Sequence, residues 1–387
     1  MHADAEGDAP AVVIDAVSTQ PRLPEAYARQ LAGLQAKLRE GTFSPPSETP
    51  NAVQLQQMDY LDLYPKIWGR EFGSNGIGRL REVALIEITE HERFRFYEQD
   101  PAYFPNTGQA MRDLDIAKLR DQSAGYQAAL EDAGVLVHRI GYPDPPVGPF
   151  GPMRGMKGGN ELLVLRGGSV IEKLAVSPFG FGRSEYLALW AFSKLGIPPI
   201  LAITGEGVAE AGPCFWLAED VFVAARGIAF NDEGLSQLLP VVQRSTGLDE
   251  KDFTALVIDC PGGLYFDPST GMSHHPDMLL APLDVDKVIC YSPGLDFRTW
   301  SWLKEHGYQM VEVNRREQIM FAPANLTILE PGRVIMPAGA DEAIAGVRKL
   351  GIDVTEVAYS ESLRTGGGLH CGTLRLWREP GPYSTDR

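Results

Sequence analysis

Cysteine is scarce in this sequence, and the few cysteines are not paired. The 387 residues contain no CxxC spacing and no zinc-type cluster; the four cysteines are Cys214, Cys260, Cys290 and Cys371. Scattered thiols of this kind argue against a disulfide framework or a structural zinc site. They are typical of a reducing compartment, so we expect a cytoplasmic protein with thiols available for chemistry.

Long apolar runs and blocks of positive charge are also missing. No run reaches the roughly 18 apolar residues of a membrane span. The opening stretch MHADAEGDAPAVVIDAV is acidic and does not resemble a secretory signal. The net charge is −16 without a cluster of Lys and Arg, so the electrostatic footprint of a nucleic-acid binder is absent. We expect neither a membrane nor a nucleic-acid partner, and a surface that attracts small cations.

The chain divides into an irregular beginning and a regular body. Residues 23–41 have the apolar periodicity of a helix, and the Ser/Pro-rich stretch FSPPSETPN that follows predicts a loop. We therefore expect an N-terminal tail and helix over 1–60, one catalytic domain over 61–380 and a C-terminal tail over 381–387. The sequence leaves the oligomeric state open and is compatible with a homo-oligomer.

Two kinds of segment recur through the body. Apolar hairpins with tight turns are predicted at 162–175, 214–225, 278–291 and 326–338. A helix that ends on glycine before a strand is predicted in EDAGVLVHRI, SKLGIPPILAI, KEHGYQMVEV and RKLGIDVTEV. A repeat of roughly 45 to 65 residues suggests units arranged around an axis. REVALIEI would open the first unit and CGTLRLW would close the last, which gives a fivefold α/β propeller with one domain. The alternative is an ordinary α+β protein.

Cys371 is the first candidate for chemistry, because three glycines precede it in GGGLHCGTLRLW. A thiol attacks as thiolate and needs a proton acceptor nearby. His370 is a poor partner if this segment is a strand, since neighbouring side chains on a strand point to opposite faces. The spacing of His275 and Asp277 in an extended segment instead predicts an imidazole and a carboxylate in one pocket, while His274 is out of phase. Each of these residues also has a plain structural interpretation; Asp277, for example, suits a turn or cap.

Two further polar residues precede predicted hairpins. Glu210 stands among small residues in GEGVAEAGPCFWLAED, and Asn160 follows two glycines in MRGMKGGNELLVL. An isolated Glu is usually a solvated charge. Here Glu210, His275 and Asn160 occupy the same position in three repeats, with Cys371 entering from the last one. This shared position favours a common site.

These stretches together resemble the guanidine-modifying enzymes, which include arginine deiminases, dimethylarginine dimethylaminohydrolases, arginine dihydrolases and amidinotransferases. The resemblance spans about residues 76–378 and rests on GGGLHCGT, HPDMLLAPLDVDKV, EAGPCFWLAEDVFVAARG and GRSE (182–185). It implies the fivefold α/β propeller called the pentein fold. It also implies that Cys371 is the nucleophile, His275 the acid/base and Glu210 its carboxylate partner, with Asp277 and Arg183 at the substrate. A guanidine such as arginine is the implied substrate, and neither metal nor organic cofactor is needed.

The sequence departs from the family pattern at the position of a second carboxylate. Family members commonly hold the guanidinium between two carboxylates, whereas Asn160 aligns with the first of them here; Pro213 and the stretch IAFN (228–231) replace other family residues. An amide can both accept and donate a hydrogen bond, so it also suits a less charged substrate.

We predict an amidinotransferase that moves an amidino group from arginine to an amine through a covalent Cys thiouronium. Hydrolysis of a guanidino group at the same site is the alternative. A non-catalytic propeller that only binds a partner is the third.

Overall fold

The computed structural model describes residues 59–88, 114–140, 162–173, 184–260, 269–364 and 367–386, together with the single positions 29, 32, 33, 36 and 267. The chain divides into two compact units, Met1–Met58 and Asp59–Arg387. In the first unit the four described positions are helical. The rest of the helix expected over 23–41 lies outside the described residues.

The second unit contains five three-stranded sheets within its described residues. In each sheet the central strand pairs antiparallel with one neighbour and parallel with the other. In sheet order the strands are β15 (Leu374–Arg378), β1 (Leu80–Ile86) and β2 (Leu136–Ile140); β3 (Leu162–Leu165), β4 (Gly168–Ile171) and β5 (Pro199–Ala202); β6 (Phe215–Ala218), β7 (Val221–Arg226) and β8 (Thr254–Asp259); β9 (Leu280–Asp284), β10 (Lys287–Cys290) and β11 (Gln309–Glu312); β12 (Thr327–Glu330), β13 (Arg333–Pro337) and β14 (Asp353–Val357).

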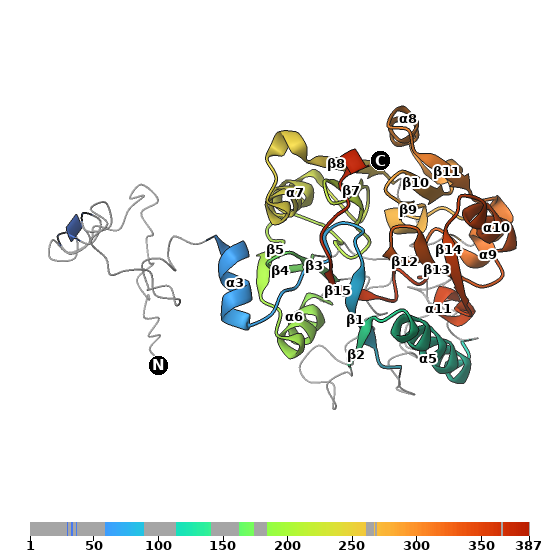
Figure 1. Ribbon diagram of the computed structural model, residues 1–387, viewed down its shortest axis with the longest axis horizontal. Helices are drawn as coiled ribbons and strands as arrows, with labels where there is room; N and C mark the ends of the chain where they lie inside the picture. Colours follow the sequence, from blue (N-terminus) through green and yellow to red (C-terminus); the bar gives the residue numbers. More distant parts are fainter. Residues whose placement is uncertain are drawn as a thin grey trace, which may run out of the picture. The chain divides into compact units, whose positions relative to one another are not determined.

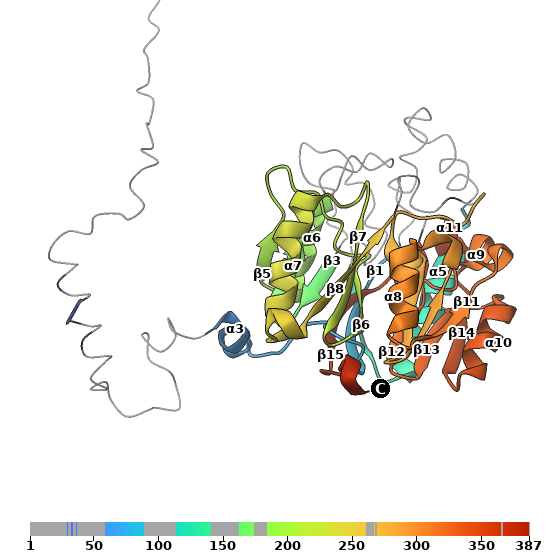
Figure 2. The same cartoon turned by 90° about the horizontal axis from the view of Figure 1, so that it is seen from above.

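One helix crosses from the central strand of each sheet to its parallel neighbour. These helices are α5 (Ile116–Asp132), α6 (Ser184–Leu195), α7 (Asp232–Thr246), α8 (Phe297–Glu305) and α10 (Asp341–Lys349). Figures 1 and 2 show them around the outside of the strands. Parallel strands need such a crossover, and a helix covers the apolar face of its own sheet. The unit that recurs in the sequence is therefore a hairpin, a helix and a strand.

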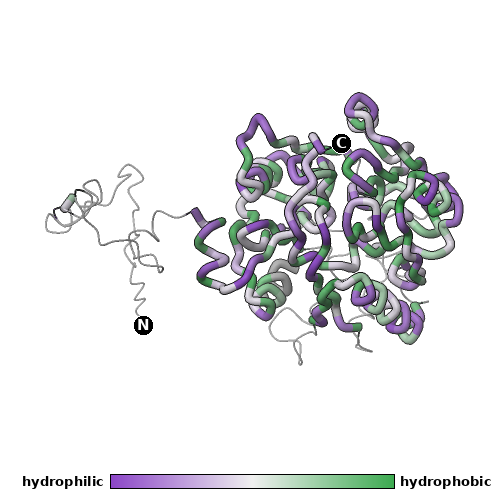
Figure 3. Tube along the Cα trace, viewed as in Figure 1, coloured by the Kyte–Doolittle hydropathy of each residue, from purple (hydrophilic) through white to green (hydrophobic). Residues whose placement is uncertain are grey.

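The remaining described elements lie between these units. They are α3 (Tyr60–Trp68), α9 (Arg315–Phe321), α11 (Ser360–Arg364) and the short 3₁₀ turns η2 (Glu250–Asp252), η3 (Pro276–Met278), η4 (Ser292–Gly294) and η5 (Ser384–Asp386). None of the described helices has the length and apolar character that a membrane crossing requires. In Figure 3 hydrophilic colour gathers along the outer rim of the second unit.

The four hairpins expected from the sequence are confirmed as β3–β4, β6–β7, β9–β10 and β12–β13. Their strands are buried on both faces, as in β3, where all four residues are buried. Strands covered on both faces lose the apolar/polar alternation, which explains the continuous apolar runs in the sequence.

The glycines expected after four helices adopt the predicted backbone conformation. Gly134, Gly196, Gly307 and Gly351 have φ angles of +80°, +67°, +74° and +82°. This left-handed region strains residues that carry a Cβ and is accessible to glycine without strain. Each glycine turns the chain from the end of a helix directly into the parallel strand.

The first sheet is completed by strands from both ends of the second unit. Leu80 of β1 pairs with Arg378 of β15 in an antiparallel ladder, and Figure 1 shows the two strands side by side. Beyond β15, the Gly381 amide donates to the Glu219 carboxylate (2.9 Å) and Ser384 bonds to Asp220. The last residues are thus tied to the turn between β6 and β7.

Candidate active site

In four of the five sheets, the first strand of the antiparallel pair is preceded by a loop that carries a buried polar residue. Glu210 precedes β6, Asp277 precedes β9, Asn325 precedes β12 and Cys371 precedes β15. Because the units have the same orientation around the ring, their equivalent loops meet at one end of it. The geometry below shows which of these side chains touch.

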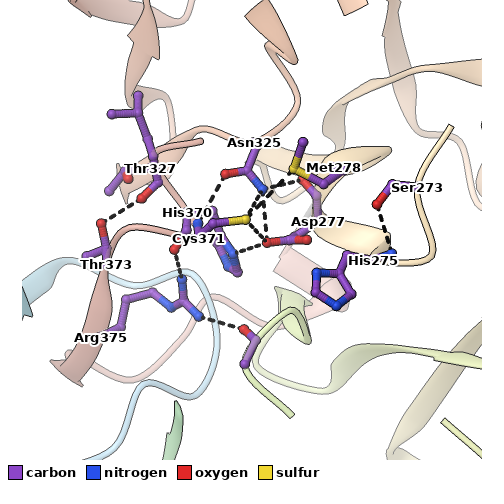
Figure 4. Close-up of polar contacts among 12 residues, drawn as sticks. Ser273, His275, Asp277, Met278, Asn325, Thr327, His370, Cys371, Thr373 and Arg375 are labelled. Carbon is purple, nitrogen blue, oxygen red and sulfur yellow. Dashed lines mark hydrogen bonds and ion pairs between the residues drawn. The ribbon is translucent and has the colours of Figure 1, made fainter. Parts of the chain in front are cut away.

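Cys371 lies in a turn over Leu369–Gly372 and is 2% exposed. Its Sγ lies 3.3 Å from Asp277 Oδ2 and 3.0 Å from the amide Nδ2 of Asn325 (Figure 4). The Asn325 side chain also accepts a hydrogen bond from the Cys371 backbone N–H through Oδ1, at 3.1 Å. One amide therefore fixes both the backbone and the sulfur of this residue.

The Cys371 thiol is neutral in this environment. Burial raises its pKa well above the ordinary value, and the negative charge of Asp277 raises it further. The hydrogen bond from Asn325 acts in the opposite direction but is weaker. With the thiol as donor, Asp277 Oδ2 is the acceptor that the sulfur faces.

Asp277 contacts three other polar side chains of the site. Its Oδ2 accepts hydrogen bonds from Asn325 Nδ2 (2.9 Å) and from His370 Nδ1 (2.8 Å), in addition to the Cys371 thiol. Its Oδ1 is buried and has no hydrogen-bond partner within the described part of the chain. Burial alone would raise the pKa of Asp277, but the hydrogen bond and charge of His370 and the charge of His275 lower it on balance. The site therefore presents an ionised carboxylate with one free acceptor atom.

His370 lies in the site beside Cys371, although the alternation of side chains on a strand predicted that the two would point to opposite faces. Residues 369–372 form a turn and β15 begins only at Leu374, so strand alternation does not apply to this pair. Both His370 and Cys371 contact the same oxygen of Asp277. Burial and the charge of Arg375 lower the pKa of His370 to about 4. At neutral pH its imidazole is uncharged and donates its Nδ1 proton to Asp277.

Glu210 and His275 form a second buried pair. The His275 Nε2 and Glu210 Oε2 are 2.7 Å apart, and both side chains are less than 5% exposed. The backbone of His275 donates to Ser273 Oγ at 3.0 Å, and that of Glu210 donates to Ala229 O at 3.0 Å. In Figure 4 the His275 imidazole lies on the side of Asp277 that is remote from the sulfur.

His274 lies beside this pair although the sequence placed it out of phase. Its ring centroid is 4.5 Å from that of His275 and the residue is 2% exposed. One donor atom each from Glu210, His274 and His275 lie within 4.8 Å of one another. Two imidazoles and a carboxylate are a ligand set that suits Zn²⁺. The pair suited to acid/base chemistry therefore also belongs to a set of three residues whose donor atoms are close enough together to hold one metal ion.

Two predicted substrate residues, Asn160 and Arg183, lie outside the described residues. The sequence reasoning did not consider Asn325 and set His370 aside, but both are in direct contact with Asp277. Asn325 could have been found, because it lies in the loop directly before its hairpin, as Glu210 and Asp277 lie before theirs. His370 could not, because its role depends on the turn before β15.

No protein-family model matches the chain. A 2-nitroimidazole nitrohydrolase from Mycobacterium sp. (strain JS330) is 35% identical over 328 residues, which cover 82% of this chain and 85% of that protein. Among solved structures, a dimethylarginine dimethylaminohydrolase from Pseudomonas aeruginosa complexed with citrulline has a TM-score of 0.56 at 19% identity, covering 77% of this chain and 99% of its own.

Two further structures have the same fold. An amidinotransferase from Microseira wollei in the saxitoxin biosynthetic pathway has a TM-score of 0.54 at 17% identity, covering 80% of this chain and 98% of its own. The N-terminal domain of an arginine dihydrolase from cyanobacteria, bound to product, has a TM-score of 0.57 at 14% identity, covering 76% and 96%. With the five-sheet architecture and the 35% identical relative, these likenesses establish that the chain belongs to the guanidine-modifying enzyme superfamily of pentein fold.

Proposed function

We propose that this protein is a hydrolase in which Cys371 attacks a carbon bonded to three nitrogens, and that a 2-nitroimidazole is the substrate type to test first. The observation that carries the proposal is the contact between the Cys371 sulfur and Asp277, whose second oxygen is buried and has no partner among the described residues. A ring N–H that donates to this oxygen would place the adjacent carbon next to the sulfur. The 35% identical relative is named for hydrolysis of 2-nitroimidazole.

The reaction would proceed in two displacements. The Cys371 thiol gives its proton to Asp277 Oδ2 as the sulfur forms a bond to C2 of the ring, while the bond from C2 to the nitro nitrogen breaks and nitrite departs with the electron pair. Asp277 returns this proton when the sulfur leaves in the second displacement. Water then attacks the same carbon, the C–S bond breaks, and the ring leaves as an imidazolone with the thiol restored. His275, paired with Glu210, would take the proton from this water. Nitrite leaves as a stable anion and needs no proton.

Asn160 is proposed to hold the other ring nitrogen. A neutral imidazole offers one N–H and one lone pair, which a carboxylate and an amide can satisfy together. Two carboxylates would suit a guanidinium better, because each charged hydrogen bond is worth about 1.5–3 kcal/mol. The replacement of one carboxylate by Asn160 therefore favours an uncharged substrate.

Substitution of the nucleophile is the direct test. Cys371→Ser should reduce nitrite release from 2-nitroimidazole by at least ~10³-fold, because a hydroxyl is a far weaker nucleophile at this position. His275→Gln should slow the second displacement more than the first, so that mass spectrometry detects an adduct on Cys371. Cys290→Ser is the matched control, since this buried cysteine of β10 contacts the Ser292 hydroxyl rather than Asp277. Full activity in Cys371→Ser would disprove covalent catalysis.

Transfer of an amidino group from arginine is the second candidate. The motif GGGLHCGT favours it, and the first displacement would be the same except that His275 must protonate the departing amine. Incubation with labelled arginine, with and without amine acceptors, separates the two candidates. Product that appears only in the presence of an acceptor would support transfer, and nitrite release without any reaction of arginine would support the hydrolase.

A further inference from the structure

Two buried arginines lie on β15, beyond the site described above. Arg375 is 8% exposed and Arg378 is 5% exposed. Buried charges are normally paired with an opposite charge, because burial removes their hydration. Within the described part of the chain, neither guanidinium has a carboxylate at ion-pair distance, and the hydrogen bonds of both go to backbone carbonyls.

These carbonyl bonds hold the two side chains in place without neutralising them. Arg375 donates to the carbonyl of His370 at 3.2 Å and to that of Gly212 at 3.3 Å. Arg378 donates to the carbonyls of Gly78 and Ile328 at 2.9 and 2.6 Å. A guanidinium has five N–H donors, so these bonds leave donors on each group.

The two cations also act on each other. Burial and the charge of Arg375 lower the pKa of Arg378 to about 9, and burial lowers that of Arg375 while Asp277 raises it. Both groups stay charged at neutral pH. Their mutual repulsion inside the protein would be relieved by a negative charge between them.

A cavity lies where such a charge would fit. Arg375 and Arg378 line it together with Ser74, Asp277 and His370, and its volume is about 30 Å³. A space of roughly 10–15 Å³ by this measure holds one water molecule, so a monatomic anion fits as well. Among the described lining residues, Asp277 supplies one negative charge against two positive ones, and His370 is neutral at pH 7.

An irregularity in β15 brings both arginines to this cavity. Residues three apart on a regular strand point to opposite faces. The pairing of β1 with β15 shifts register between the pairs Leu80–Arg378 and Glu82–Trp377, and again after the second pair. Such bulges redirect side chains and are over-represented beside functional sites. The convergence of the two guanidinium groups is therefore a property of the folded strand.

We propose that this cavity is a binding site for a small monatomic anion, chloride in the cell, held between the guanidinium groups of Arg375 and Arg378. The cavity also borders Asp277, the carboxylate that faces the Cys371 sulfur. The binding site itself does not depend on the proposed hydrolase activity.

Crystals grown in sodium bromide test the site without any substitution. The expected result is an anomalous scattering peak inside the cavity, within contact distance of both guanidinium groups. Electron density there without an anomalous signal would mean that the cavity holds water, and the proposal would be overturned. Bromide peaks confined to the protein surface would have the same meaning.

Thermal unfolding provides a second test in solution. In sodium chloride the melting temperature should be several degrees higher than in sodium gluconate at the same ionic strength, because a ligand that binds the folded state stabilises it. Arg378→Met should abolish this difference, and Arg298→Met, at an exposed arginine, should retain it. Equal melting temperatures of the wild type in the two salts, or a full chloride effect in Arg378→Met, would refute the site. If Arg378→Met fails to fold, the bromide experiment on the wild type decides.

Discussion

The thiol of Cys371 shares one carboxylate oxygen with two other hydrogen-bond donors. Asn325 and His370 both bond to Asp277 Oδ2, so their geometry determines the environment of the sulfur. The first two predictions concern these neighbours, because each changes the site without removing the nucleophile.

Asn325 should control the ionisation of Cys371. Asn325→Ala removes the N–H that donates to the sulfur at 3.0 Å, so the pKa of the thiol should rise further. Asn325→Asp keeps an acceptor for the Cys371 N–H but adds a negative charge, and should raise the thiol pKa more than the alanine does. We expect a loss of roughly 10²-fold in the alkylation rate of Cys371 at pH 7.5, by comparison with the removal of one preorganised donor.

The pH dependence of Cys371 alkylation by iodoacetamide measures this effect. Gln318→Ala is the control, because this buried amide donates to Gly271 and Met278 carbonyls rather than to the sulfur. A wild-type pH profile in both Asn325 variants would show that the contact does not tune the thiol.

His370 should make the protein less stable in mild acid. Its folded pKa of about 4 lies below the ordinary 6.5, so between these values the unfolded chain binds a proton that the folded chain does not. The stability contribution is complete above pH 6.5 and is lost as the pH falls towards 4. Between pH 7.5 and pH 5.0 the wild type should lose about 2 kcal/mol more unfolding free energy than His370→Gln. Urea unfolding at the two pH values measures this difference, and equal losses in both proteins would contradict it.

At the scale of single elements, the turn from helix to parallel strand depends on glycine. Gly351 follows α10 with φ +82°, and a Cβ added there would meet no atom within 4 Å. Gly351→Ala therefore tests backbone strain without a steric clash, and should destabilise the protein by about 1 kcal/mol. Gly125→Ala, in the exposed middle of α5, should instead stabilise by about 0.5–1 kcal/mol. Chemical denaturation of the two variants should give changes of opposite sign; the same sign in both would contradict this account.

Glycine is required around the nucleophile for a different reason, because neighbouring atoms lie too close to leave room for a Cβ. A Cβ on Gly372 would lie 2.0 Å from the Tyr359 hydroxyl oxygen, and one on Gly368 would lie 2.8 Å from Asn325 Oδ1. Within the described part of GGGLHCGT, glycine thus lets the Cys371 turn pack directly against its neighbours. The motif reflects packing of the turn rather than freedom of the backbone.

At the scale of the whole molecule, one buried carboxylate connects three distant parts of the ring. Glu219, in the turn between β6 and β7, pairs with Arg166 in the turn between β3 and β4 and accepts from the Gly381 amide. Its side chain is fully buried whereas that of Arg166 is 34% exposed. The burial of this ion pair is therefore intermediate between that of a surface salt bridge and that of a fully buried one.

Loss of this connection should weaken the closed ring. Glu219→Ala leaves Arg166 and the Gly381 N–H without their acceptor, and should lower the unfolding free energy by about 3 kcal/mol. Glu379→Ala removes the partner of Arg81 at an exposed position and should cost about 1 kcal/mol or less. Urea unfolding of both variants is the measurement, and similar losses would show that burial does not distinguish the two pairs.

Local patterns in the sequence were sufficient to predict the repeating architecture and four of the polar residues of the site. Hairpins of continuous apolar residues and glycines after helices are local features, since they follow from burial of both strand faces and from the left-handed backbone conformation. The same phase in successive repeats singled out Glu210 and His275, which form a hydrogen-bonded pair. Cys371 and Asp277 were also identified, and they lie in contact.

Contacts between segments far apart in the chain determined which side chains face each other. The turn over Leu369–Gly372 let His370 reach Asp277 beside Cys371, and the loop before β12 brought Asn325 to both. The register shift in β15 turned Arg375 and Arg378 towards one cavity. Turns and bulges change the direction of a side chain without a distinct sequence pattern, because their geometry is fixed by packing between units that are far apart along the chain.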